Sequence, residues 1–167
     1  MKWRMAAVFC LVLTLALGGQ IFAQTQMTDS GTNYGSATPK VMPIDKDHLV
    51  LIWEQMGVRV DDSGKGPFHN MATHLAMIIY IDKGVEQDHG YMTQSDKDGD
   101  TVIWEIWAYP IGSRTGKGKV IGATGKFEGM EGTMDYVLAP TPKSVPAETG
   151  RTIAHEVIKY TLKNPLQ

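Results

Sequence analysis

Residues 102–109 read Val-Ile-Trp-Glu-Ile-Trp-Ala-Tyr, and this stretch decides the fold. Successive side chains of a β-strand point to opposite faces. One face would carry Val102, Trp104, Ile106 and Ala108, and the other would carry Ile103, Glu105, Trp107 and Tyr109. Both faces are mostly apolar, and apolar faces must be covered. We therefore expect one face to line the interior of a barrel and the other to pack against a neighbouring element or subunit.

Further apolar segments of strand length occur along the chain, separated by breaks rich in Gly and Asp. The segments are residues 49–60, 71–81, 101–109, 119–121, 133–138 and 151–162. Their spacing is typical of a small antiparallel sheet or barrel. The last segment also fits a helical stripe, and we assign it to a strand because a barrel needs a closing one.

Residues 71–81 show the same alternation. Their odd positions are apolar apart from Thr73 and include Leu75 and Met77, while the even positions are mixed and include His74. Leu75 and Met77 therefore share one face of the expected strand. The pattern leaves open which face of each strand turns into the barrel.

The first 23 residues have the features of a cleavable signal peptide. Lys2 and Arg4 supply positive charge, residues 5–17 form an apolar run without a charge, and Ala23 precedes the favoured cleavage site, with Gly18 as the alternative. The run is 13 residues long, whereas a helix that spans a bilayer needs about 20. We predict an exported protein, periplasmic or secreted, with no permanent membrane anchor.

The mature chain would be one acidic domain without cysteine. The single cysteine, Cys10, leaves with the signal, and the remaining 144 residues are enough to bury a core without disulfides. Cleavage removes two of the 16 basic residues and none of the 18 acidic ones, which leaves a net charge of −4. A mildly acidic chain without a basic stripe argues against nucleic acid as a partner.

Residues 24–43 are rich in Thr, Ser, Gly, Asn and Gln and hold few large apolar side chains. Such a segment cannot bury enough apolar surface to offset the entropy lost on ordering. We expect a flexible leader here, followed by the barrel domain over residues 44–167.

Residues 96–100, Asp-Lys-Asp-Gly-Asp, place three carboxylates at alternate positions. This pattern is similar to the start of a calcium-binding loop. The glycine falls one position early, however, and Trp107 stands where the bidentate Glu should be. We favour an Asp-Gly turn that leads into the next strand, with the carboxylates capping backbone amides.

Residues 122–132 are rich in glycine and enclose Phe127. A phosphate loop would end in Gly-Lys-Ser or Gly-Lys-Thr and would be followed by a helix, and neither feature is present. We interpret the glycines as bulges and a sharp turn, with Phe127 filling an apolar gap.

Together these two motifs carry a resemblance. Asp-x-Asp-Gly-Asp leading into an aromatic strand, then Gly-x-Thr-Gly-Lys-Phe-x-Gly-x-x-Gly, resembles bacterial exported proteins with an allene-oxide-cyclase-like barrel, relatives of plant allene oxide cyclases and dirigent proteins. The likeness covers roughly residues 49–160. It implies an all-β fold, an antiparallel barrel of about eight strands with an apolar cavity, often assembled as a trimer through the outer surface. Trp107 and Tyr109 would suit such a surface. The catalytic groups of the plant enzymes cannot be matched to residues of this chain.

The sequence shows no established catalytic or metal-binding pattern. His69 and His74 would lie on opposite faces of a strand, and His155 and Glu156 are adjacent, so neither pair suits a metal. No nucleophile elbow, Cys–His pair or pair of carboxylates in an apolar setting is apparent. We predict no metal and no cofactor.

Three functional hypotheses follow. In the first, the barrel binds a small hydrophobic ligand, with Trp104, Ile106, Leu75 and Met77 as wall residues. In the second, it is a cofactor-free cyclase or isomerase acting on a lipophilic substrate, with Glu105 or His74 as the polar group to test first. In the third, the interior is filled and the outer surface serves a structural or interaction role, with a homo-oligomer as the assembly. The sequence does not decide whether the protein is an enzyme.

Overall fold

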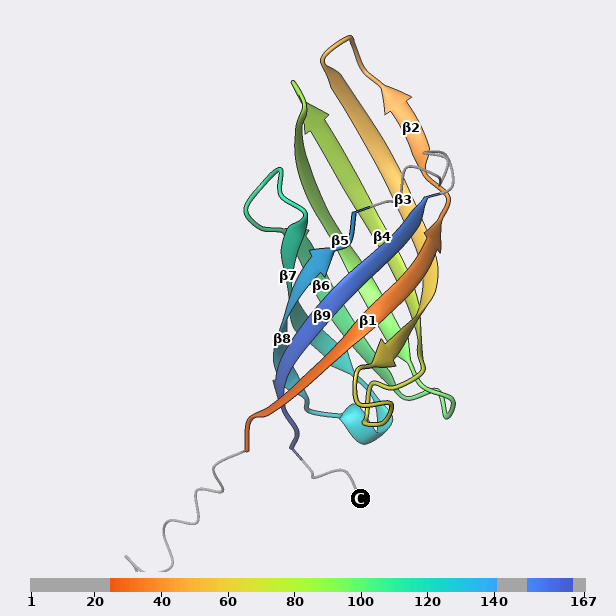
Figure 1. Ribbon diagram of the computed structural model, residues 1–167, viewed down its shortest axis with the longest axis vertical. Coiled ribbons are helices and arrows are strands. Elements are labelled where there is room, and N and C mark those ends of the chain that lie inside the picture. The colour runs from red at the N-terminus through yellow and green to blue at the C-terminus, as the bar shows by residue number, and fades with distance from the viewer. Residues whose placement is uncertain (1–24, 141–149, 164–167) are drawn as a thin grey trace, which may run out of the picture.

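The computed structural model describes residues 25–140 and 150–163, which form a closed antiparallel β-barrel (Figure 1). The predicted signal peptide, residues 1–23, lies outside the described residues. The expected fold class, an all-β antiparallel barrel of about eight strands, is confirmed.

The described residues form nine strands and one short 3-10 helix. They are β1 (Met27–Ala37), β2 (Lys40–Pro43), β3 (His48–Asp61), β4 (Met71–Asp82), β5 (Val85–Ser95), β6 (Thr101–Ala108), β7 (Thr115–Ala123), η1 (Gly125–Phe127), β8 (Glu131–Leu138) and β9 (Arg151–Thr161).

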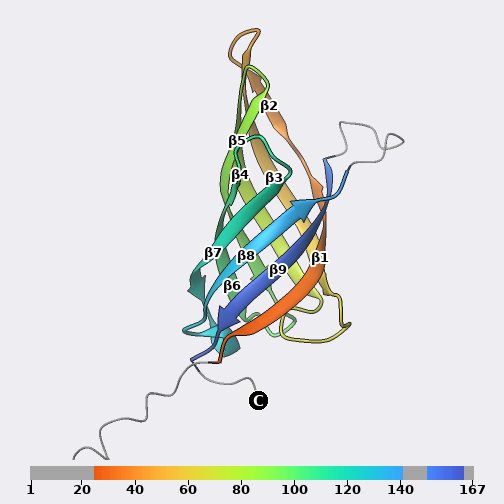
Figure 2. The same ribbon diagram turned by 60° about the vertical axis from the view of Figure 1, so that its left-hand side comes forward.

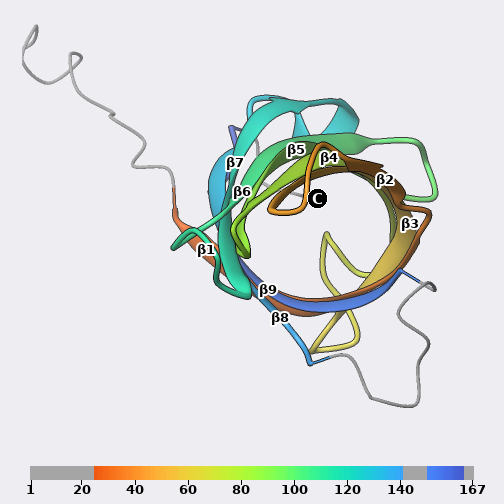
Figure 3. The same ribbon diagram turned by 90° about the horizontal axis from the view of Figure 1, so that it is seen from above.

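The strands are hydrogen-bonded in the order β1-β9-β8-β7-β6-β5-β4-β3-β2. Figure 2 shows β8, β9 and β1 side by side in the wall. A further pairing of β1 with β3 closes the ring, which is seen from above in Figure 3. Because β1 and β2 pair with successive parts of β3, the ring has 8 strand positions.

The period-2 pattern fixes which side chains face inward. In β6, Val102, Trp104, Ile106 and Ala108 are buried, so the even face of residues 102–109 is the inner one. In β4 the odd positions are buried, apart from the partly buried Ile81, and the even positions are exposed. The strand assignment for β9, whose sequence also fitted a helix, is confirmed.

The flexible leader predicted for residues 24–43 is wrong from Met27 onward, because residues 27–43 carry β1 and β2. β1 is hydrogen-bonded on both sides, to β9 and to β3. Its composition is polar because its inward side chains enter a polar part of the interior. Gly35 is one such position, where an added Cβ would lie 2.1 Å from the Gln55 amide nitrogen. The low hydrophobicity of β1 reflects the polar side chains that it packs against, such as Gln55. The barrel therefore begins at β1.

The 96–100 motif forms the turn that the sequence predicts. Gly99 has a φ of +86°, and the amides of Asp98 and Asp100 donate to Asp96 Oδ1 at 2.9 and 3.0 Å. The backbone amide of Lys126 donates to Asp100 Oδ2 at 3.1 Å. The carboxylates therefore cap backbone amides and anchor η1 to the turn between β5 and β6.

Aromatic side chains plug the lower end of the barrel. Phe127 of η1 and Phe68 of the loop 62–70 are fully buried, with ring centroids 5.6 Å apart. The Tyr160 ring packs edge-on against Phe68 at 5.2 Å. The prediction that Phe127 fills an apolar gap is confirmed, and an interior cavity lies toward the other end of the barrel.

Gly90 is required by the close approach of β5 to β4. A Cβ at this position would lie 2.3 Å from Met77 Cβ and 2.4 Å from the Ala76 carbonyl oxygen, and backbone atoms cannot move aside cheaply. We expect Gly90→Ala to lower the free energy of unfolding by about 1–3 kcal/mol, measured by urea denaturation. Gly122→Ala is the control, because its Cβ would meet nothing nearer than 3.5 Å. Equal stability of the two variants would contradict this packing.

Candidate functional site

The upper half of the barrel contains a cavity of about 160 Å³. Its position follows from its lining residues, which include the start of β5, the end of β8 and the start of β9. A cavity of about 150 Å³ holds one benzene molecule. Most of the wall is apolar, and the apolar residues are Trp53, Leu75, Met77, Ile79, Met92, Ile106, Met134, Leu138 and Ala154.

Below the cavity lies a buried network of charged and polar groups centred on Arg59. Its side chain is fully buried; Nε donates to Glu156 Oε2 at 3.1 Å and Nη2 to Asp29 Oδ1 at 2.5 Å. The guanidinium also lies 5.4 Å from the centroid of the Phe68 ring. Arg59 thus joins β1, β3 and β9 to the aromatic plug, and its charge is compensated by two carboxylates.

Glu156 connects this network to the cavity, which it helps to line. Its Oε1 accepts from Asn33 Nδ2 at 3.1 Å, and its Oε2 accepts from Gln94 Nε2 at 3.3 Å as well as from Arg59. Burial raises the pKa of Glu156, and Arg59 and the two amides oppose that rise. Because every neighbour donates to it, Glu156 is held in place as part of the cavity floor.

Two carboxylates stand at the cavity mouth. Glu86 and Asp88 are two residues apart on β5, so both side chains are on the inner face. Asp88 Oδ1 accepts a short hydrogen bond from the backbone amide of Ala108. Burial raises the pKa of Asp88, and burial together with the Asp88 charge raises the pKa of Glu86. Both groups are therefore easier to protonate than an ordinary surface carboxylate.

Tyr136 supplies the hydroxyl group of the cavity. The residue is 8% exposed, and its hydroxyl makes no hydrogen bond to any of the residues in 25–140 and 150–163. Burial raises the pKa of Tyr136 far above its ordinary value. The group is a neutral phenol that can donate or accept one hydrogen bond.

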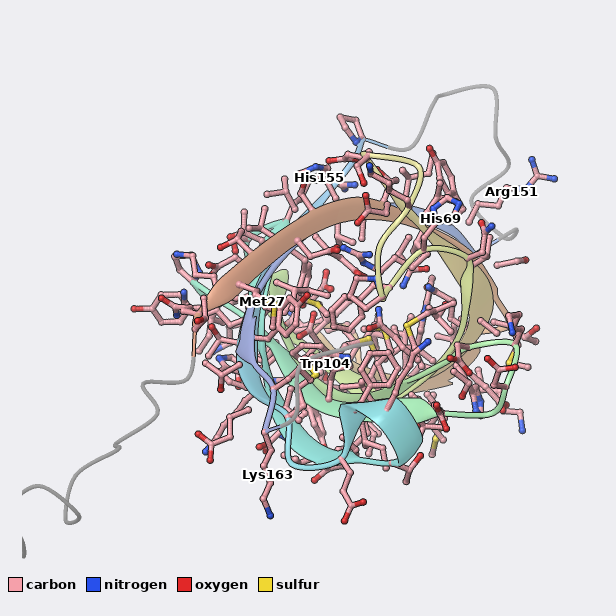
Figure 4. All side chains as sticks on the ribbon, turned by 90° about the horizontal axis from the view of Figure 1, so that it is seen from below. Met27, His69, Trp104, Arg151, His155 and Lys163 are labelled. Atoms are coloured by element: carbon pink, nitrogen blue, oxygen red, sulfur yellow. The ribbon has the colours of Figure 1, made fainter. Side chains whose placement is uncertain are left out.

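Three of the wall residues proposed from the sequence lie on the cavity wall: Leu75, Met77 and Ile106. Trp104 points into the barrel, as Figure 4 shows from below, but it is fully buried beneath the cavity. Its Nε1 donates to Gln94 Oε1 at 2.9 Å. Trp104 therefore supports the polar network, and the part that the other three play in binding stays a prediction.

The two polar groups proposed for catalysis, Glu105 and His74, do not reach the cavity. His74 Nε2 lies 3.1 Å from Glu54 Oε1, and Glu105 Oε1 lies 2.9 Å from His89 Nε2, all on the outer surface. The reason is strand phase. The inner face of β4 takes the odd positions and that of β6 the even ones, which places both candidates outside.

Sequence reasoning did not identify Glu86 and Asp88, which line the cavity together although Glu86 is exposed and Asp88 half-buried. β5 is not among the apolar segments because its inward positions include Glu86, Asp88 and Gln94 along with Met92. One sequence signal could have identified them. The two acids are spaced i, i+2, as residues on one face of a strand are, within the 11 residues of β5 that lie between two turns. Tyr136 and Glu156 were also missed as cavity residues.

Within the described part of the chain, no group of three or more His, Cys, Asp or Glu side chains is placed to hold a metal ion. In the same residues no helix is both long and apolar enough to cross a membrane.

No protein-family model and no curated protein sequence matches the chain. Among solved structures it is similar to the pterocarpan synthase dirigent protein GePTS1, with a TM-score of 0.51 and 12% identity over 87% of this chain and 91% of that one. The pterocarpan synthase dirigent protein PsPTS1 gives a TM-score of 0.56 and 13% identity over 84% of this chain and 97% of that one. The fold is therefore dirigent-like.

Asp29 gives the polar network a dependence on pH. Burial and a hydrogen bond with Asp61 raise the pKa of Asp29 to about 6, whereas its ordinary value is 3.8. The folded chain thus binds a proton that the unfolded chain has lost, so this contribution to stability is complete below pH 3.8 and is lost as the pH rises to about 6.

We expect Asp29→Asn to remove this dependence. The difference in unfolding free energy between wild type and variant should change in favour of the variant from pH 4 to pH 6, by at most about 1.4 kcal/mol per pH unit. Urea denaturation at several pH values measures it, with the exposed Glu128→Gln as control. Parallel curves of unfolding free energy against pH for wild type and Asp29→Asn would contradict the raised pKa of Asp29.

Proposed function

We propose that this protein binds a small, largely apolar ligand inside its barrel. The observation that carries the proposal is the cavity of about 160 Å³, walled by apolar side chains and lined at one end by the first residues of β5 and β9. The two similar solved structures are pterocarpan synthase dirigent proteins, and the shared barrel supports a small-molecule ligand here.

The size and composition of the cavity restrict the ligand. Its buried part is about one aromatic ring, and a larger molecule would extend through the mouth. Met77, Met92 and Met134 are unbranched and flexible, so the wall can adapt to ligands of different shape.

A second candidate is a cofactor-free cyclase or isomerase that acts on a lipophilic substrate. It is favoured by the position of Asp88 and Tyr136, two groups that can hold a proton at an apolar cavity. In this alternative they take the place of Glu105 and His74. It also agrees with the resemblance to allene-oxide-cyclase-like barrels, and compounds found to bind would be the first substrates to assay.

We also propose that the chain is exported, to the periplasm or the exterior. The support is the order of charged, apolar and small residues over positions 1–23.

The outer surface supports assembly into a homo-oligomer, with a trimer as the form implied by the sequence resemblance. Tyr34 is paired in register with Val58 on one side and with Ile153 on the other, and all three side chains are exposed. We call these three residues the Tyr34 patch. Adjacent exposed apolar side chains on three strands are what a subunit interface would cover.

Val58→Lys should therefore shift the molar mass measured by light scattering from oligomer to monomer, because a lysine would be desolvated at the interface. Ile121→Lys is the control, since Ile121 is also exposed but lies on β7, outside the Tyr34 patch. A monomeric wild type, or an oligomer that Val58→Lys leaves intact, would refute this assembly.

Binding in the cavity is tested with fluorobenzene, followed by ¹⁹F NMR. Wild type should bind it saturably, and Ala154→Phe should weaken binding at least about tenfold because the added ring occupies the cavity. Ala76→Phe is the matched control, because Ala76 faces outward from β4. Failure of wild type to bind, or equal binding by Ala154→Phe, would overturn the proposed function.

A further inference from the structure

The ionisable side chains that line the cavity are of one sign. Glu86, Asp88 and Glu156 are acidic, and among the lining residues there is no Lys, Arg or His. Glu156 is already compensated by Arg59. The two carboxylates at the mouth therefore determine the charge that the cavity offers to a ligand.

Neither of these carboxylates forms an ion pair with another described residue. Asp88 has one hydrogen bond, from the Ala108 amide, and its neighbour His89 turns to the outer face to meet Glu105. The charge of Arg114 lowers the pKa of Glu86. The Arg114 guanidinium, however, donates its hydrogen bonds to the carbonyls of Leu138 and Ala139. No described basic side chain is in ion-pair contact with either acid, so both carboxylates remain available to a cationic ligand.

The Tyr136 hydroxyl is a second and independent feature that favours a ligand with an N–H group. Tyr136, 8% exposed as a residue, borders the same cavity, and its hydroxyl makes no hydrogen bond to any residue described by the structure. A phenol oxygen that faces a cavity is an acceptor for an N–H group. Trp53 and Tyr136 are aromatic residues of the cavity lining, and aromatic rings attract cations.

We propose that the ligand is a protonated amine joined to an aromatic ring or short alkyl group. The apolar group lies between Leu75, Met77 and Ile106, and the ammonium lies at Glu86, Asp88 and Tyr136. A cation there relieves the repulsion between the two acids and replaces the water that they lose. The inference rests on the proposed ligand-binding function and adds the charge of the ligand to it.

The test compares three ligands of one size and different charge: 4-fluorobenzylamine, 4-fluorobenzyl alcohol and 4-fluorobenzoate, each titrated at pH 7 by ¹⁹F NMR. We expect the amine to bind at least about tenfold more tightly than the alcohol, and the benzoate most weakly. An alcohol that binds as tightly as the amine overturns this inference and leaves the proposed function standing. If no compound binds, fluorobenzene included, both fail.

Two variants locate the preference. In Glu86→Gln/Asp88→Asn, the ratio of amine to alcohol affinity should fall at least about tenfold, toward one. Asn retains an acceptor for the Ala108 amide, and circular dichroism checks that the barrel is intact. Glu128→Gln, an exposed acid next to η1, should keep the wild-type ratio. A folded double variant that keeps the preference for the amine overturns the assignment.

Discussion

The barrel depends on the burial of one positive charge. Arg59 is fully enclosed, and an unpaired guanidinium in that position would cost several kcal/mol. Arg59 is on β3, and its partners Asp29 and Glu156 come from β1 and β9. The same group therefore holds together the three strands around the point where the ring closes. Gln94 and Trp104 extend the network to β5 and β6. The arrangement of the interior follows from satisfying these groups.

The two halves of the barrel are consequently different. The lower half is occupied by the polar network and by the stacked rings of Phe68 and Phe127. The upper half is walled mostly by apolar side chains, three of them methionines, and it contains the cavity. Because Glu156 belongs to both, the rigidity of the lower half also fixes the floor of the cavity.

Much of the wall could be predicted from the sequence, and the polar interior could not. The alternation in residues 102–109 identified β6, and the apolar runs placed parts of five further strands. β1 and β5 escaped because their inward positions include Asp29, Asn33, Asp88 and Gln94, which look like loop residues until their partners are known. Glu105 and His74 failed for a different reason: a period of two gives two faces, and only the closed barrel decides which is inside.

The pairing of β1 with β9 also constrains how the chain can fold. Residues 27–36 pair with residues 151–160, so this seam joins segments that are far apart in the sequence. Contacts this distant in the chain form slowly, because much of the chain must be ordered before they are made. Arg59 cannot acquire Glu156 until β9 has been synthesised. Burial of this guanidinium before then would leave it incompletely paired, which costs free energy, so compaction around Arg59 is disfavoured until the final strand is present.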